Sequence, residues 1–197
     1  MIIAHKIALD PNDRQATDFA RACGTARFCD NWALAEWQRQ YAARKDDPSL
    51  PAPSEAALRR LLNCLKAEPF PWMTEVTKNA PQQAIKNLGA AFKRFFAGQG
   101  KYPRFKKKGV HDSFRADPGP DKNHPHAVAV SGKHVKLPVI GWVRMKEPLC
   151  FSGKVMSAVV SRTADQWFVS LTVEVPDAIP HREKQAVVGV DHGVKAL

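Results

Sequence analysis

A single aspartate near the carboxyl end of the chain has neighbours suited to metal-dependent phosphodiester chemistry. Asp191 follows the apolar run AVVGV (186–190) and is flanked by two glycines. A buried strand would present the carboxylate at its exit, and the small neighbours would let a phosphate and a metal ion approach. Two-metal hydrolysis needs several carboxylates holding ions about 4 Å apart, so Asp191 alone is insufficient. Taken alone, VDHG (190–193) is also typical of a hairpin turn.

A second group of residues is suited to nucleic acid. Between Val76 and His111 the chain carries nine basic residues and no acidic one, which leaves +2 of the +11 net charge for the rest of the molecule. In GKYPRFKKKG (100–109), cations that can neutralise phosphates alternate with aromatic rings that can stack on bases. The candidate nucleic-acid-binding residues are Lys78, Lys86, Lys93, Arg94, Lys101, Tyr102, Arg104, Phe105, Lys106, Lys107 and Lys108.

The alternative for this tract is a solvated charge run at the end of a helix, where basic residues also complement the helix dipole. In that alternative Phe105 is a core residue. The length of the acid-free tract favours nucleic-acid contact, because a concentrated positive surface is what a polyanion recognises.

Composition bounds the class of protein. The chain has 197 residues, 44% of them hydrophobic, which is enough for a buried core. It has no apolar run of the roughly 20 residues that span a bilayer and no signal-peptide pattern at the start, so we expect a cytoplasmic protein without a membrane partner. The four cysteines lack CxxC spacing, which predicts reduced core residues and neither a disulfide framework nor a zinc site.

The first half of the chain has helical periodicity. Residues 2–9 form a strand candidate, after which Asp10 can cap a helix and Pro11 suits its first position. Apolar residues then recur at helical spacing to about Arg44, with Gly24 as a point where the helix can be interrupted.

Two further helices are expected before the period changes. The second places Leu58, Leu61, Leu62 and Leu65 on one side. The third opens near Pro81, turns Ile85, Leu88, Phe92 and Phe95 inward and leaves Lys86 and Lys93 on an outer stripe.

From His111 the apolar period becomes two. HAVAV (126–130), KHVKLP (133–138) and GWVRMK (141–146) are short strand candidates, and residues 154–162 and 166–175 form a hairpin around the turn TAD. About six such strands with Gly and Pro punctuation predict a small barrel. PDAIPHREKQ (176–185) is predicted to be a linker.

Five stretches, in order, resemble the TnpB (OrfB-type) family of bacterial insertion sequences, transposon-encoded RNA-guided endonucleases related to type V CRISPR effectors. They are GTARFCDNWALA (24–35), QQAIKNLGAAFKRFFAG with YPRFKKK (82–98 and 102–108), VKLPVIGWVRMK (135–146), KVMSAVVSRTADQWFVSLTVEV (154–175) and AVVGVDHGVKAL (186–197). The resemblance covers essentially the whole chain.

The resemblance implies a fold and a division of the chain. The fold is α+β: an oligonucleotide-binding-like β-barrel (the wedge) with an inserted helical recognition domain, ending at the first strand of an RNase H-like, RuvC-type nuclease domain. The barrel takes residues 1–10 and, with the linker, 110–185. The recognition domain takes residues 11–109, and the nuclease domain starts at residues 186–197.

The resemblance also implies a function in transposition and DNA recombination. The wedge would hold the guide RNA, the recognition domain would lie against the guide–target DNA duplex, and Asp191 would be the first catalytic, Mg²⁺-binding aspartate. The family's later carboxylates and its zinc-binding cysteines fall beyond Leu197. We therefore expect this chain to bind nucleic acid and, alone, not to cleave it.

Two other interpretations stay open at this point. One is a DNA-binding transposition accessory or nuclease-dead regulator whose first helices form a helix-turn-helix with its turn at Gly24. The other is an unrelated RNA-binding protein in which the Asp191 motif is accidental. The sequence does not indicate the oligomeric state, the guide RNA or the target-adjacent motif.

Overall fold

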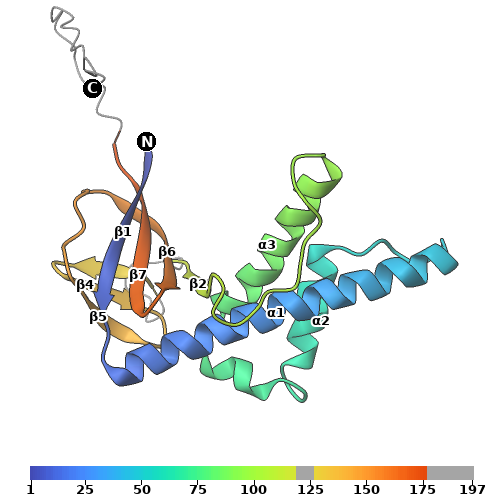
Figure 1. The fold of residues 1–197 in the computed structure, drawn as a ribbon, viewed down its shortest axis with the longest axis horizontal. Coiled ribbons are helices and arrows are strands. Elements are labelled where there is room, and N and C mark those ends of the chain that lie inside the picture. The colour runs from blue at the N-terminus through green and yellow to red at the C-terminus, as the bar shows by residue number, and fades with distance from the viewer. Residues whose placement is uncertain (119–126, 177–197) are drawn as a thin grey trace, which may run out of the picture.

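The chain folds as an α+β protein with one antiparallel sheet and a group of helices beside it (Figure 1). The computed structural model describes residues 1–118 and 127–176. The expected nuclease strand, with Asp191, lies outside the described residues. Within them, no helix is both long and apolar enough to cross a membrane.

The sheet has seven strands in the order β2-β6-β7-β1-β5-β4-β3, and every pairing is antiparallel. The strands are β1 (Ile2–Asp10), β2 (Ser113–Ala116), β3 (Ala129–Ser131), β4 (His134–Leu137), β5 (Gly141–Met145), β6 (Lys154–Thr163) and β7 (Gln166–Glu174). The expectation that the first strand pairs with later ones is confirmed, since Ile2 faces Glu174 and Leu9 faces Met145. Residues far apart in sequence are thereby joined at the centre of the sheet.

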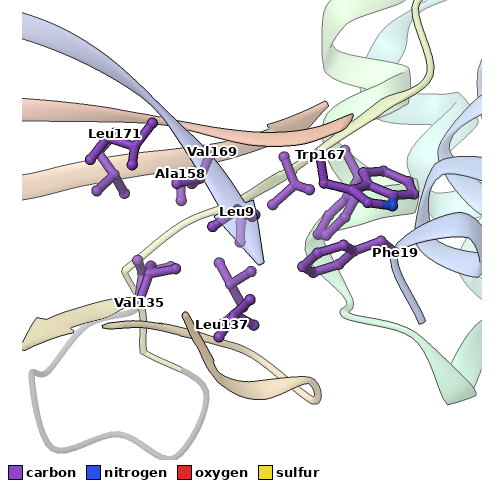
Figure 2. Packing of buried hydrophobic residues seen from close by; sticks show 14 of the residues in the cluster. Leu9, Phe19, Val135, Leu137, Ala158, Trp167, Val169 and Leu171 are labelled. Carbon is purple, nitrogen blue, oxygen red and sulfur yellow. The ribbon is translucent and has the colours of Figure 1, made fainter. Parts of the chain in front are cut away.

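The sheet curls around its own core. β1 pairs with β7 from Ile2 to Ala8 but with β5 only through Leu9 and Asp10, so it joins two differently oriented halves. Side chains from both halves fill the space between them, among them Val135 and Leu137 on one side and Val169 and Leu171 on the other (Figure 2). The alternating pattern of β7 is therefore the pattern of a strand with one buried face.

β2 is a strand that periodicity did not indicate. It has four residues, too few for alternation to stand out, and it is held by pairing with β6, where Phe114 faces Val160. Phe114 and Ala116 are buried in the sheet core. A distant partner therefore determines this strand.

Helix α1 (Asp13–Asp46) begins two residues later than predicted and ends close to the predicted Arg44. Its N-cap is Asn12, not Asp10: the Asn12 side chain accepts from the Gln15 backbone N–H at 2.9 Å, and the Gln15 side chain accepts from the Asn12 N–H at 3.2 Å. This reciprocal pair is a capping box. The helix runs through Gly24 without interruption and is about 50 Å long.

Three shorter elements pack against α1: α2 (Glu55–Leu65), a 3₁₀ helix η1 (Pro71–Glu75) and α3 (Asn79–Phe96). α3 starts two residues before the predicted Pro81 and buries Ile85, Leu88 and Phe92, while Phe95 is only half-buried. α2 buries Leu58 and Leu62, but Leu61 is exposed and Leu65 half-buried, so its predicted apolar face is narrower.

α1 connects the core of the sheet with a second core formed among the helices. Phe19 packs on Trp167 of β7, with ring centroids 5.1 Å apart, and Trp37 stacks on Phe92 of α3 at 4.2 Å. Ala26, between them, contacts both clusters. In Figure 1 the helix accordingly extends from the sheet to α2 and α3.

The cysteines divide into two kinds. Cys23 and Cys29 are buried on α1, and burial raises the pKa of each thiol to about 12. Cys64 and Cys150 are exposed, so the prediction that all four are core residues is wrong for these two. All four are free thiols.

Candidate nucleic-acid interface

The nine cations of the acid-free tract lie on α3 and on the segment that follows it. Lys78 directly precedes α3, Lys86, Lys93 and Arg94 lie on the helix, and the other five lie between residues 101 and 108. All nine are exposed. Of these nine cations, only Lys106 forms an ion pair with a carboxylate of the described residues. The other eight leave their charge open to solvent, and we call them, with Phe105, the basic surface.

Lys106 has a different environment from its neighbours. Its Nζ lies 2.9 Å from Oδ1 of Asp30, a residue of α1 whose side chain is only 5% exposed. Burial raises the pKa of the Asp30 carboxyl, while the hydrogen bond and charge of Lys106 act in the opposite direction. The ammonium of Lys106 thus compensates the charge of a buried carboxylate.

The backbone of Lys106 is fastened to the same helix. The Lys106 N–H donates to Asn31 Oδ1 at 2.7 Å, and Asn31 Nδ2 donates to the Lys106 carbonyl at 3.0 Å. Together with the Asp30 ion pair, these bonds hold residues 101–108, which we call the basic segment, onto α1. A segment without helix or strand pairing thereby acquires a fixed position.

A second attachment holds the end of the segment. Asp112 accepts from Arg27 of α1 at 2.5 Å and from the Gly109 N–H at 3.0 Å, and its carbonyl accepts from the Arg162 N–H of β6 at 3.1 Å. One residue therefore joins the long helix, the basic segment and the sheet.

The two candidate aromatics differ in their surroundings. Tyr102 packs edge-on against Phe92 and Phe95, at centroid distances of 5.5 and 5.2 Å, so it helps anchor the segment on α3. Phe105 is 54% exposed and has no ring partner among the described residues. The alternative that placed Phe105 in the core is therefore wrong, and its ring is available for stacking.

Sequence reasoning missed four anchoring residues: Arg27, Asp30, Asn31 and Asp112. Asp30 carried a signal, because it lies four residues after Ala26 and seven before Trp37, within the buried stripe of α1. A carboxylate in such a stripe requires a partner. The sequence could not name that partner, which lies 76 positions away.

The predicted metal site cannot be located in this structure. Asp191 lies outside the described residues, and within residues 1–118 and 127–176 no three His, Cys, Asp or Glu side chains are grouped in a way that could hold a metal ion.

Comparison with known proteins places the chain in a class. Residues 1–46 match a family model described as a helix-turn-helix domain of the OrfB_IS605 type. An Escherichia coli K12 protein named "Putative RNA-guided DNA endonuclease InsQ" is 29% identical over 98% of this chain. A Streptomyces pristinaespiralis protein named "Putative RNA-guided DNA endonuclease" is 30% identical, also over 98% of this chain. This chain spans about half the length of these relatives, 46% of each.

These matches define the class as the OrfB-type proteins, and the chain belongs to the TnpB/OrfB family. Despite the description of the matched region, residues 1–46 contain strand β1 and the single helix α1, and Gly24 lies inside that helix. The helix-turn-helix alternative, which placed its turn at Gly24, therefore loses its geometric basis.

Proposed function

We propose that this chain binds nucleic acid through the basic surface and is the guide-RNA- and target-DNA-binding part of an RNA-guided DNA endonuclease. The observation that carries the proposal is that eight of the nine cations in the tract lack a carboxylate partner among the described residues. Eight uncompensated charges on one helix and the segment after it repel one another. A phosphate backbone would relieve that repulsion.

The division of the chain follows the same proposal. Residues 1–10 and 110–185 would form the oligonucleotide-binding-like wedge, which the pairing of β1 with β5 and β7 and the curl of the sheet support. Residues 11–109 would form the recognition domain. Guide RNA would be held by backbone charge and shape, with sequence read by base pairing to the target.

The proposed nuclease role rests on Asp191 within residues 186–197. Its carboxylate would bind Mg²⁺ and help position a phosphodiester. Magnesium sites rely on several oxygen ligands and the substrate phosphate, and one matching carboxylate supplies too few. We therefore propose that the activity of these 197 residues is binding.

The proposal is tested by RNA affinity as a function of salt. Replacing Lys107 and Lys108 together with alanine should flatten the log–log salt slope by about 1.4 to 1.8, because each lost phosphate contact removes about 0.7 to 0.9. Lys45→Ala, an exposed lysine outside the tract, is the matched control and should leave the slope unchanged. An unchanged slope in the double variant would remove the basic segment from the binding surface.

Phe105 gives the same test a second, charge-independent readout. Phe105→Ala should weaken RNA binding by about 1 to 3 kcal/mol if a base stacks on the ring, with little change in salt slope. Because the ring is exposed, the melting temperature should hardly change. A variant that melts earlier but binds normally would contradict the stacking role.

A further inference from the structure

Gly24 lies in the interior of α1, where glycine is the least favourable residue except proline. A Cβ added at this position would meet only Nη2 of Arg27 within 4 Å, at an ordinary contact distance of 3.9 Å. The helical backbone does not need a glycine there, and neither does packing within the described residues. Glycine is also used where another molecule approaches the backbone closely.

Two surface hollows meet at Gly24. The first, of about 510 Å³, is lined by Gly24, Arg27, Phe28, Asn31 and Trp32. The second, of about 320 Å³, is lined by Arg21, Gly24, Thr25, Trp72, Glu75 and Val76. The α1 members of the first hollow recur at helical spacing and so share one face of the helix. We call the two hollows the Gly24 groove.

Two of the three aromatic residues of the groove, Phe28 and Trp72, are held by ring contacts. Phe28 packs edge-on against Phe70 and Trp72, at centroid distances of 5.0 and 5.2 Å. Trp72 is nevertheless 38% exposed. Rings held this way form a platform on which a planar ligand can pack without ordering the side chains first.

Two arginines, each beside one carboxylate, supply hydrogen-bond donors to the groove. Arg27 donates from Nη1 to Asp112, whereas Nη2, the atom nearest Gly24, has no hydrogen-bond partner among the described residues. The side chain of Arg21 is 61% exposed, and its nearest carboxylate, Glu75, is 3.9 Å away. The groove therefore combines apolar rings with cationic donors.

We propose that the Gly24 groove binds an unpaired nucleotide of a folded RNA, with the base against the aromatic rings and the phosphate near Arg21 and Arg27. The inference rests on the proposed function. Folded RNA is the partner this combination fits, because its loops and bulges present unstacked bases that proteins hold on aromatic rings and arginines. The groove also adjoins the basic segment, since Asn31 both lines the groove and bonds the backbone of Lys106.

The test places a side chain in the groove and measures binding of a labelled RNA hairpin with an unpaired loop. Gly24→Leu adds a strong helix former where there is space, so the melting temperature should not fall. Its RNA affinity should drop about tenfold or more, the loss expected when a stacked base is displaced. The matched control is Ala35→Leu, which adds the same side chain at an exposed position of α1 outside the groove, and it should bind as the wild type does.

A second variant keeps the test decisive if Gly24→Leu fails to fold. Arg21→Gln changes an exposed side chain and should flatten the salt slope by about 0.7 with an unchanged melting temperature. Normal RNA affinity in a folded Gly24→Leu variant, or an equal loss in Ala35→Leu, would overturn the inference. Selective loss of single-stranded DNA binding would overturn the RNA assignment. A wild-type chain that binds no RNA would refute the proposed function as well, before any variant is compared.

Discussion

At the residue scale, Lys106 differs from the lysines beside it in having a buried partner. In KKK (106–108) the three side chains are chemically identical, yet only the first pairs with a carboxylate among the described residues. Its charge is already compensated by Asp30, so it should release few counterions when a phosphate approaches. Its contribution is to hold the segment in place.

This environment predicts a pH-dependent defect in Lys106→Met. Burial raises the pKa of Asp30, so the folded state holds the proton more tightly than the unfolded state does, and stability falls as pH rises through that raised pKa. Lys106 opposes the shift. Without it, the variant should lose about 1 to 3 kcal/mol at neutral pH and recover in acid, where Asp30 is protonated.

The measurement is thermal unfolding of Lys106→Met and wild type across pH. The Asp30→Asn/Lys106→Met double variant is the control, because it has no buried charge to titrate. A stability difference that stays constant from neutral to acidic pH would show that Asp30 does not depend on Lys106.

At the scale of elements, α1 determines how the two cores are placed. Its first turns pack in the sheet core, its middle carries Asp30 and Asn31, and its later turns pack against α3. A break at any of these points would separate the basic segment from the sheet. The integrity of the helix is therefore a requirement for the interface.

The capping box at Asn12 gives a test of where this helix begins. Asn12→Ala removes the side-chain acceptor for Gln15 and should cost about 1 kcal/mol, which corresponds to about 2 to 4 °C in melting temperature for a chain of this size. Asp10→Ala should cost less, because the contact of the Asp10 side chain with the described residues is an exposed 3.8 Å ion pair with Arg144. A larger loss in Asp10→Ala would restore Asp10 as the cap.

At the scale of the whole molecule, the described residues form a scaffold that joins a curled sheet to a helical group. Asp112 contacts α1, the basic segment and β6 together. Movement of the helices relative to the sheet would have to break these bonds. The basic surface and the Gly24 groove are consequently held in one arrangement.

The proposed division between binding and cleavage leads to a prediction about catalysis. With divalent metal and a supplied guide RNA, the 197-residue chain should bind nucleic acid but leave target DNA intact, because Asp191 would supply one ligand where several are needed. In a longer protein that includes this chain, Asp191→Ala should abolish cleavage and leave guide binding nearly unchanged. Metal-dependent cutting by the 197-residue chain, lost in Asp191→Ala, would contradict this division.

The sequence by itself determined the features that depend on local order. Alternation predicted the hairpin of β6 and β7, helical spacing predicted the inward face of α3 with Lys86 and Lys93 outside, and charge counting found the basic tract. These patterns are readable because neighbouring residues on a strand or helix share a face by geometry.

Only the tertiary structure decided the features that depend on distant partners. The four-residue strand β2 forms through its pairing with β6. Lys106 differs from Lys107 because a carboxylate on another element, Asp30 of α1, pairs with it. The helical conformation at Gly24 also depends on tertiary contacts. Packing of α1 in both cores keeps the helix continuous where local propensity allowed a turn. Burial and pairing free energies come from contacts between segments, and one-dimensional periodicity does not contain them.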